Sequence, residues 1–209
     1  MQAAMAPREA RPIEYALHIC ERRMQTDPQL PEYLRADCSR CSALCCVAPS
    51  FDKAQGFGFD KAAHTRCALL GDDFACSIHG DLIARGFAGC ASFDCYGAGQ
   101  RVTQQMFGDV SWRVDRKIAK RIFEAYSRMR TLHELLAMLF VVKSRTSNPN
   151  IAAEVRNRTR KVERVCRLDS AEFDRVEVGE IRLEVMMFLR SINALTSKEP
   201  KASRVTSHR

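Results

Sequence analysis

Eight cysteines fall within one part of the chain, between positions 38 and 95. Four of them stand within nine residues, in the stretch CSRCSALCC from 38 to 46. Closely spaced thiolates are typical ligands of zinc and of iron–sulfur clusters, because two ligands two to four residues apart can come from one turn. The candidate metal ligands are Cys38, Cys41, Cys45, Cys46, Cys67, Cys76, Cys90 and Cys95.

The spacing C-x2-C-x3-C places Cys38, Cys41 and Cys45 on one predicted centre, with a fourth ligand from the group between 67 and 95. Around a tetrahedral ion their sulfurs should lie within about 4 Å of one another. Cys46 follows Cys45 directly, and neighbouring side chains usually diverge, so one of the two is expected to face a second site. Eight thiols suffice for two four-ligand sites. Spacing alone leaves the metal open between zinc and an iron–sulfur cluster.

Other uses of the thiols are less favoured. The first residues, MQAAMAPREARP, contain no apolar run of the kind that directs export, so we expect a cytoplasmic protein with reduced thiols rather than a disulfide framework. Cys38 and Cys41 also have the spacing of a redox dithiol, but six further cysteines nearby make metal binding the better interpretation. His79, three residues after Cys76, is equally a ligand or a bystander.

The sequence gives no clear indication of an enzyme. His133 and Glu134 begin the zinc-protease pattern H-E-x-x-H, but position 137 is Ala, so the second histidine ligand is absent. Two cysteines lie apart from the others. Cys20 is expected on the apolar face of a helix over 12–26, where it is interpreted as a small hydrophobic residue, and Cys166 lies in the second half of the chain.

The elements around the cysteines change in character along the chain. From 37 to 100 glycine is frequent and no helical period is sustained, which predicts an irregular module with a small hairpin around 69–78 and a helical turn at 81–86. This segment has few apolar clusters. We therefore expect metal coordination, rather than burial, to organise it.

The second half has the apolar spacing of helices. Stripes over 114–129 and 132–142 predict two helices, the second starting at a capping-box pattern formed by Thr131 and Glu134. Asn148 and Pro149 predict the start of a third, and the spacing over 181–195 predicts a fourth. The fold class is thus mainly α: a small irregular cysteine-rich metal-binding module with minor β structure, packed with a helical bundle. The predicted segments are a helix and lead-in (1–36), the module (37–100), the bundle (101–197) and a disordered basic tail (198–209).

Charge is unevenly distributed. The net charge is +8, and residues 101–209 hold 23 Lys and Arg against 13 Asp and Glu. An arginine stripe on one predicted helix could meet phosphates, but no aromatic residues accompany it, so a solvated helix face is favoured over nucleic-acid binding. The stripe consists of Arg156, Arg160, Arg164 and Arg167. The most apolar run, 132–142, is too short to cross a bilayer, so no membrane partner is expected.

Several steps of the cysteine pattern match a known family. C-x2-C-x3-C-C at 38–46, Cys67-Ala-Leu-Leu, Cys76-Ser-Ile-His79 and the Gly86 to Cys90 step resemble the bacterial family of zinc- or iron-chelating cysteine-cluster proteins. The continuation over 93–100 is similar to the variant found ahead of the repeats in some pentapeptide-repeat proteins. The resemblance covers residues 38–100 and implies metal binding through the cysteines.

The pattern as a whole predicts a metal-binding protein in which the metal is at least structural. Two alternatives stay open. With an iron–sulfur cluster the chain is an electron-transfer protein or part of a redox enzyme. With zinc it is an adaptor, which binds a protein or nucleic acid along the basic helix.

Overall fold

The fold is that of a computed structural model, which describes residues 30–196. It is mainly helical, as predicted. In chain order the elements are the 3-10 helices η1 (Glu32–Leu34) and η2 (Cys38–Arg40), α2 (Leu44–Val47), the 3-10 helices η3 (Lys53–Gln55) and η4 (His79–Asp81), α3 (Ala88–Ser92), α4 (Ala98–Gln100), the π-helix η5 (Arg101–Met106), α5 (Arg116–Arg145), α6 (Pro149–Cys166), α7 (Ser170–Phe173) and α8 (Val178–Thr196).

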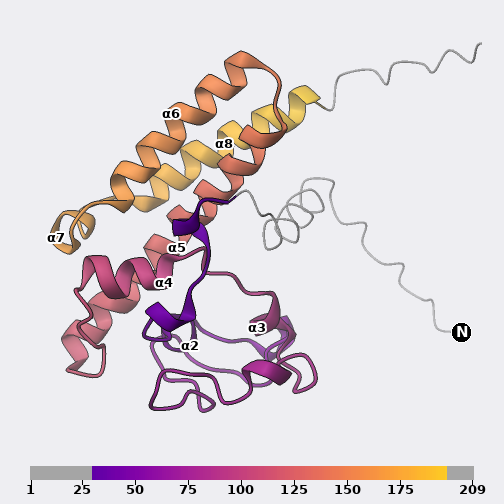
Figure 1. The fold of residues 1–209 in the computed structure, drawn as a ribbon. Helices are drawn as coiled ribbons and strands as arrows, with labels where there is room; N and C mark the ends of the chain where they lie inside the picture. The colour runs from indigo at the N-terminus through magenta and orange to yellow at the C-terminus, as the bar shows by residue number, and fades with distance from the viewer. Residues whose placement is uncertain (1–29, 197–209) are drawn as a thin grey trace, which may run out of the picture.

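Helix α5 is the axis of the molecule. It packs against α6 and α8 at one end and against α4, η5 and α2 at the other, so the long helices occupy one end of the molecule and the irregular module the other (Figure 1). Leu132, Leu136 and Leu139 on α5 are fully buried. The cysteine-rich module thus rests on the same helix that organises the bundle.

The helix starts follow from polar side chains that accept the unpaired N–H groups of a first turn. Asp115 accepts the N–H groups of Lys117 at 2.7 Å and Ile118 at 2.9 Å, and α5 begins directly after it. Asn148 does the same for α6, with Pro149 at the first helical position, as the sequence predicted.

The prediction of two helices across 114–142 is wrong, because α5 is a single helix of 30 residues. Thr131 does not cap a helix start. Its hydroxyl donates to the carbonyl of Ser127, one turn earlier, and Glu134 pairs with Arg130 at 3.7 Å. The sequence has no glycine or proline here to interrupt the backbone hydrogen bonds, so a pattern typical of a cap lies inside a continuous helix.

The module has minor β structure, as expected. Among the described residues it consists of two isolated antiparallel bridges, Phe51 with Lys61 and Leu70 with Cys76. The second bridge closes the predicted hairpin turn, where the N–H of Gly71 donates to the carbonyl of Ala75 at 2.8 Å. No strand is long enough to be named within 30–196, so turns and short helices carry the cysteines.

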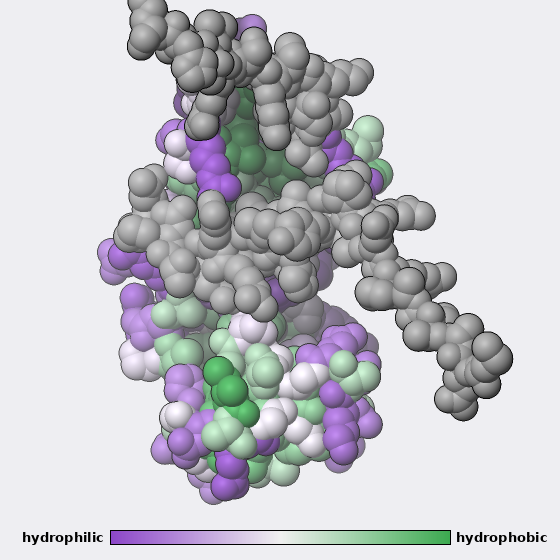
Figure 2. Space-filling model, turned by 90° about the vertical axis from the view of Figure 1, so that its right-hand side faces the viewer, coloured by the Kyte–Doolittle hydropathy of each residue, from purple (hydrophilic) through white to green (hydrophobic). Residues whose placement is uncertain are grey.

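The module has more apolar packing than its composition indicated. Phe51 stacks on Phe57 with ring centroids 4.7 Å apart, and Phe59 meets Phe87 edge to face at 5.3 Å. The buried residues of the module and of the helices form one continuous cluster, because Leu44 and Val47 of α2 join the α5 residues. The surface of the module is mixed, with purple, white, pale green and some strongly green residues interspersed in Figure 2.

The segment before α4 connects the two parts. Tyr96 and Gly97 both have left-handed backbone conformations. At Gly97 a side chain is impossible, since a Cβ there would lie 2.2 Å from the carbonyl oxygen of Tyr33. This close approach brings the chain after Cys95 against the η1 segment and turns it into α4.

Some predictions lie outside the described residues, namely the helix over 12–26 with Cys20 and the tail 198–209. Between residues 30 and 196, no helix is both long and apolar enough to span a bilayer.

Candidate metal centre

All eight predicted cysteines are described and none forms a disulfide. Cys38 lies in η2, Cys45 and Cys46 lie in α2, and Cys90 lies in α3. Cys76 forms the β-bridge with Leu70, and Cys41, Cys67 and Cys95 lie in irregular segments. By their neighbours they divide into two groups of four, for which we use two names. The helix-side thiols are Cys38, Cys41, Cys45 and Cys95, and the loop-side thiols are Cys46, Cys67, Cys76 and Cys90.

Two of the helix-side thiols, Cys41 and Cys95, lie at α4. A Cβ built on Gly99 would lie 2.6 Å from the Cys41 Sγ and 3.9 Å from the Cys95 Sγ, so both sulfurs occupy the space in front of this glycine. Mutual charge links the same residues, because the thiolates of Cys41 and Cys95 help to raise the pKa of Cys45. Gly99 therefore leaves room for two sulfurs at a buried helix start.

Backbone N–H groups point at two of these sulfurs. The Cys41 sulfur accepts from the amides of Leu44 and Ala43, and the Cys95 sulfur accepts from those of Gly99 and Gly97. Such bonds favour a thiolate over a thiol. Ala43 has a φ of 57°, the left-handed conformation that folds its amide back toward Cys41. These turns therefore present both sulfurs in a form suited to a cation.

Burial opposes ionisation at the same positions. It raises the pKa of Cys41 to about 11, in spite of the N–H groups that favour the thiolate. Burial is also the main cause of the raised pKa of Cys95. A bound cation would reverse this balance, because coordination of a thiol by a metal removes its proton.

The hydroxyl of Tyr126 on α5 is next to these thiols. Its oxygen is buried and has no hydrogen-bond partner among the described residues. Burial raises the pKa of Tyr126 most, and the charges of Cys45, Cys95 and Cys41 raise it further. A buried O–H without an acceptor is costly, and a metal-bound thiolate is an acceptor that this place could supply.

The loop-side thiols are positioned by the turns of the module. The N–H of Cys67 donates to the carbonyl of Cys46 at 3.1 Å, and the Leu70–Cys76 bridge brings Cys76 back toward Cys67. Cys90 completes the group from α3. Its pKa is raised to about 11, first by burial and then by the charges of the other three loop-side thiols.

Lys61 gives the loop-side thiols a buried positive neighbour. Only 7% of it is exposed, and its Nζ donates to the carbonyls of Pro49, Ala62 and Thr65 at 2.5, 3.1 and 2.9 Å. No carboxylate pairs with it within residues 30–196. Burial lowers the pKa of Lys61, and the thiolates of Cys67 and Cys46 oppose that shift. A buried ammonium needs negative charge nearby, which these thiolates can provide.

Cys45 and Cys46 are the boundary between the groups. Their Sγ atoms lie 4.0 Å apart. The hydrogen bond from the Cys45 thiol lowers the pKa of Cys46 most, and the charge of Lys61 lowers it further, so Cys46 ionises before Cys45. The thiolates of Cys41 and Cys95 affect Cys45, whereas Cys46 affects Cys67 and Cys90. Cys46 also raises the pKa values of Cys45 and Cys38, so it remains a prediction that the two adjacent residues face different sites.

The described cysteine sulfurs do not surround a point at which an ion could bind. Within residues 30–196, no three His, Cys, Asp or Glu side chains are placed to hold one metal ion. The expected approach of the Cys38, Cys41 and Cys45 sulfurs to about 4 Å is thus not seen. Cys38 in η2 is exposed as a residue. Partial burial of its thiol, followed by the charges of Asp37 and Cys46, raises its pKa, and its own charge raises the pKa of Cys95. Cys38 therefore borders both groups.

The remaining candidates lie apart from the thiols or are exposed. His79 is exposed in η4, and Cys166 is buried in α6, where burial raises its pKa to about 12. The arginine stripe of α6 is exposed along its length. Arg160 donates to Asn157 at 2.6 Å and Arg167 pairs with Glu163 at 3.7 Å, contacts that are typical of a solvated helix face.

Sequence reasoning missed four residues that support these groups: Gly99, Lys61, Tyr126 and His133. Each acts on residues distant along the chain. His133 is 2% exposed, and its Nδ1 lies 2.6 Å from the carbonyl oxygen of Tyr96, beside Cys95. For Gly99 the sequence offered one local indication, because two glycines follow Cys95 closely in the run Tyr96 to Gly99.

Comparison with known proteins adds one relative. Over 177 residues, which make up 83% of this chain, the sequence is 36% identical to an uncharacterized protein of Bacillus subtilis (strain 168), YybG. That stretch covers 63% of YybG, so the chain spans less than two thirds of the length of its relative. No family model matches the chain, and no solved structure matches it.

Proposed function

We propose that this is a metal-binding protein whose thiolates hold zinc or an iron–sulfur cluster at two centres. The helix-side thiols would form one centre and the loop-side thiols the other. The observation that carries the proposal is that Cys41, Cys45 and Cys95 neighbour one another, as do Cys46, Cys67, Cys76 and Cys90. The two sets meet at Cys45 and Cys46, and Cys38, which borders both, would complete the first. Four thiolates are a complete ligand set for either kind of centre.

The electrostatics of both groups support this use of the thiols. Burial raises the pKa values of Cys41 and Cys90, and repulsion from neighbouring thiolates raises them further. Nothing about a neutral thiol requires the N–H groups aimed at Cys41 and Cys95, or the ammonium beside Cys46. A cationic centre makes these features consistent, because metal ligation needs deprotonated sulfur.

Elemental analysis of the full chain, purified without oxygen, tests the proposal. We expect about two zinc ions per chain, or iron with acid-labile sulfide and a brown colour. Cys95→Ser and Cys90→Ser should each remove one centre and leave the other. Cys166→Ala, which removes a buried thiol outside both groups, should keep the full metal content.

Two outcomes would contradict the proposal. One is a chain that carries no metal and takes up neither zinc nor iron with sulfide under reducing conditions. The other is an equal metal content in all three variants. If Cys95→Ser and Cys90→Ser each abolish all binding while Cys166→Ala does not, the eight thiols form one joint centre instead of two.

A further inference from the structure

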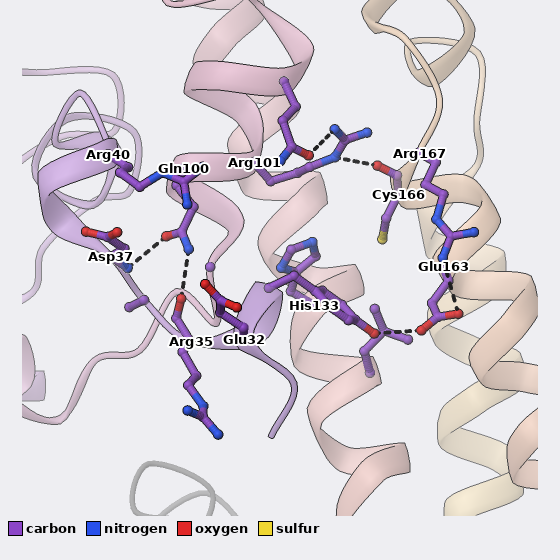
Figure 3. Close-up of a pocket in the computed structure, with 15 residues that line it drawn as sticks. Glu32, Arg35, Asp37, Arg40, Gln100, Arg101, His133, Glu163, Cys166 and Arg167 are labelled. Atoms are coloured by element: carbon purple, nitrogen blue, oxygen red, sulfur yellow. Dashed lines mark hydrogen bonds and ion pairs between the residues drawn. The ribbon is translucent and has the colours of Figure 1, made fainter. Parts of the chain in front are cut away.

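A cavity of about 520 Å³ is lined by the segment around η1 and η2 and by Gly97, in the turn that follows Cys95. It is bounded by the η1 and η2 segment, by α4 with η5, by α5 and by α6 (Figure 3). The volume is within the range of small-molecule sites. Gly97, whose amide points at Cys95, is part of its wall, but no cysteine of either group lines it.

His133, a buried residue, contributes its imidazole ring to the wall of this cavity. Its Nδ1 lies 2.6 Å from the carbonyl oxygen of Tyr96, and because a carbonyl only accepts, Nδ1 carries the proton. The other ring nitrogen, Nε2, then has a lone pair and no partner among the described residues. Burial, together with the charge of Arg101, lowers the pKa of His133 to about 4, so the ring is neutral near pH 7. A ligand with an N–H or O–H group would satisfy Nε2.

Four arginines line the same cavity, namely Arg35, Arg40, Arg101 and Arg167. The Nε of Arg35 donates to the carbonyl of Leu30 at 2.9 Å. Arg40 comes from η2, Arg101 from η5 and Arg167 follows α6 (Figure 3). Arg101 is fixed, because its Nε donates to the carbonyl of Cys166 at 2.7 Å and its Nη1 to Gln105 at 2.5 Å. Burial and the nearby charge of Arg167 lower the pKa of Arg101. Two guanidinium groups close enough to repel are a typical arrangement for an anion.

Three carboxylates, Glu32, Asp37 and Glu163, line the cavity with the four arginines, so the lining carries one net positive charge. Asp37 accepts from the amide of Ser39 at 3.1 Å and from its hydroxyl at 2.5 Å, so it caps η2. Glu163 accepts from the hydroxyl of Tyr33 at 2.6 Å and pairs with Arg167 at 3.7 Å. Among the described residues, Arg40 and Arg101 have no carboxylate partner. Glu32 is the remaining carboxylate, and it is exposed at the rim.

We propose that the cavity binds a small anionic metabolite with a carboxylate or phosphate group and a nearby hydroxyl or amine. The guanidinium groups of Arg40, Arg101 and Arg167 would bind the anionic group, and His133 Nε2 would accept from the hydroxyl or amine. This site is separate from the proposed metal centres, and its ligand would lie next to the turn that carries Cys95.

Calorimetric titration of the full chain at constant ionic strength tests the site with three probes: inorganic phosphate, succinate, and malate, which is succinate with one added hydroxyl. We expect at least one probe to bind with a dissociation constant of about 1 mM or lower. If the natural group is a carboxylate, malate should bind more tightly than succinate because of His133. If it is a phosphate, inorganic phosphate should bind most tightly.

Two double variants with the same change in net charge form the control. Arg40→Gln with Arg167→Gln should weaken binding at least tenfold, whereas Arg156→Gln with Arg160→Gln, on exposed positions outside the cavity, should change it less than twofold. Helical circular dichroism checks that both fold. A second readout needs no variant: the ring nitrogens of His133 should shift in NMR spectra on titration, while those of exposed His79 should not. The site is overturned if no probe binds, if both double variants weaken binding equally, or if binding leaves His133 unchanged.

Discussion

The helix-side and loop-side thiols are held by different kinds of structure. Cys41 and Cys95 lie against Gly99 of α4, and both lie with Cys45 near Tyr126 of α5. Gly99 and Tyr126 are buried in these helices. The loop-side thiols are held by turns, by one β-bridge and by carbonyls that surround Lys61. The helix-side thiols are thus held by helices, whereas the segments that carry the loop-side thiols have few backbone hydrogen bonds of regular secondary structure. A ligand should contribute more to the order of the second group.

Metal removal is the strongest test of that difference. Coordination of a structural centre contributes folding free energy on the order of 10 kcal/mol. A strong chelator under reducing conditions should therefore expose the segment between Phe51 and Cys90 to protease and to rapid amide exchange, while the amides in the middle of α5 stay protected. Hydrogen exchange followed by mass spectrometry measures both regions in one sample. Protection that persists across 51–90 in the chelated protein would show that the aromatic cluster, not metal, organises the module.

Features that depend on neighbouring residues were predictable from the sequence. The cysteine spacing pointed to the candidate ligands, and the adjacency of Cys45 and Cys46 led to the prediction of two sites, because neighbouring side chains usually diverge. Both remain predictions. The start of α6 was equally local, since Asn148 and Pro149 are its cap and first residue. These signals lie within a few residues of what they predict.

Contacts between distant segments were not predictable in this way. Gly99 and Tyr126 are far from Cys41 in the sequence, and only the packing of α4 and α5 brings them to it. The capping-box pattern at Thr131 misled because residues with the right spacing occur inside helices too, where tertiary packing decides. The cavity was missed for the same reason, as η1, η5, α5 and α6 all contribute to it.

Acid should weaken the helix side in particular. The pKa of His133 is about 4 in the folded chain and near 6.5 in an unfolded one, so the unfolded state binds more protons between these values. Stability from the buried neutral ring is complete above pH 6.5 and is lost as the pH falls toward 4. The loss amounts to about 3 kcal/mol, at 1.36 kcal/mol for each pKa unit.

Urea unfolding of the wild type and of His133→Gln between pH 7.5 and pH 4 measures this contribution. The variant keeps an N–H donor for the Tyr96 carbonyl but cannot take up the proton, so its stability should fall less with acid. Metal loss and carboxylate titration affect both proteins alike. Parallel pH curves would mean that His133 is not the group that titrates.

A methyl group at Gly99 should disturb the helix-side thiols alone. Its Cβ would lie 2.6 Å from the Cys41 Sγ, so Gly99→Ala forces that sulfur to move and should cost about 1–3 kcal/mol, with loss of the helix-side metal. Gly179→Ala is the matched control, because no atom lies within 4 Å of its Cβ and alanine is the better helix former. Unfolding and metal content of both variants check this. If Gly99→Ala keeps its full metal content, the sulfurs of Cys41 and Cys95 do not need the space in front of Gly99.

The smallest expected effect concerns one hydrogen bond. Tyr126 has a buried hydroxyl without a partner, next to three helix-side thiols, and a bound centre would give it a thiolate acceptor. Tyr126→Phe removes the hydroxyl and keeps the ring. In the metal-loaded protein it should therefore destabilise by about 1 kcal/mol, whereas after chelation it should be neutral or stabilising, because an unsatisfied buried group is then removed. Unfolding of both proteins in both states gives the comparison, and the loop-side group provides the reference, since a Cys90→Ser background lacks only that centre. An identical effect of Tyr126→Phe with and without metal would mean that the hydroxyl forms no hydrogen bond with the helix-side centre. Packing of the ring would then explain why Tyr126 lies beside the thiols.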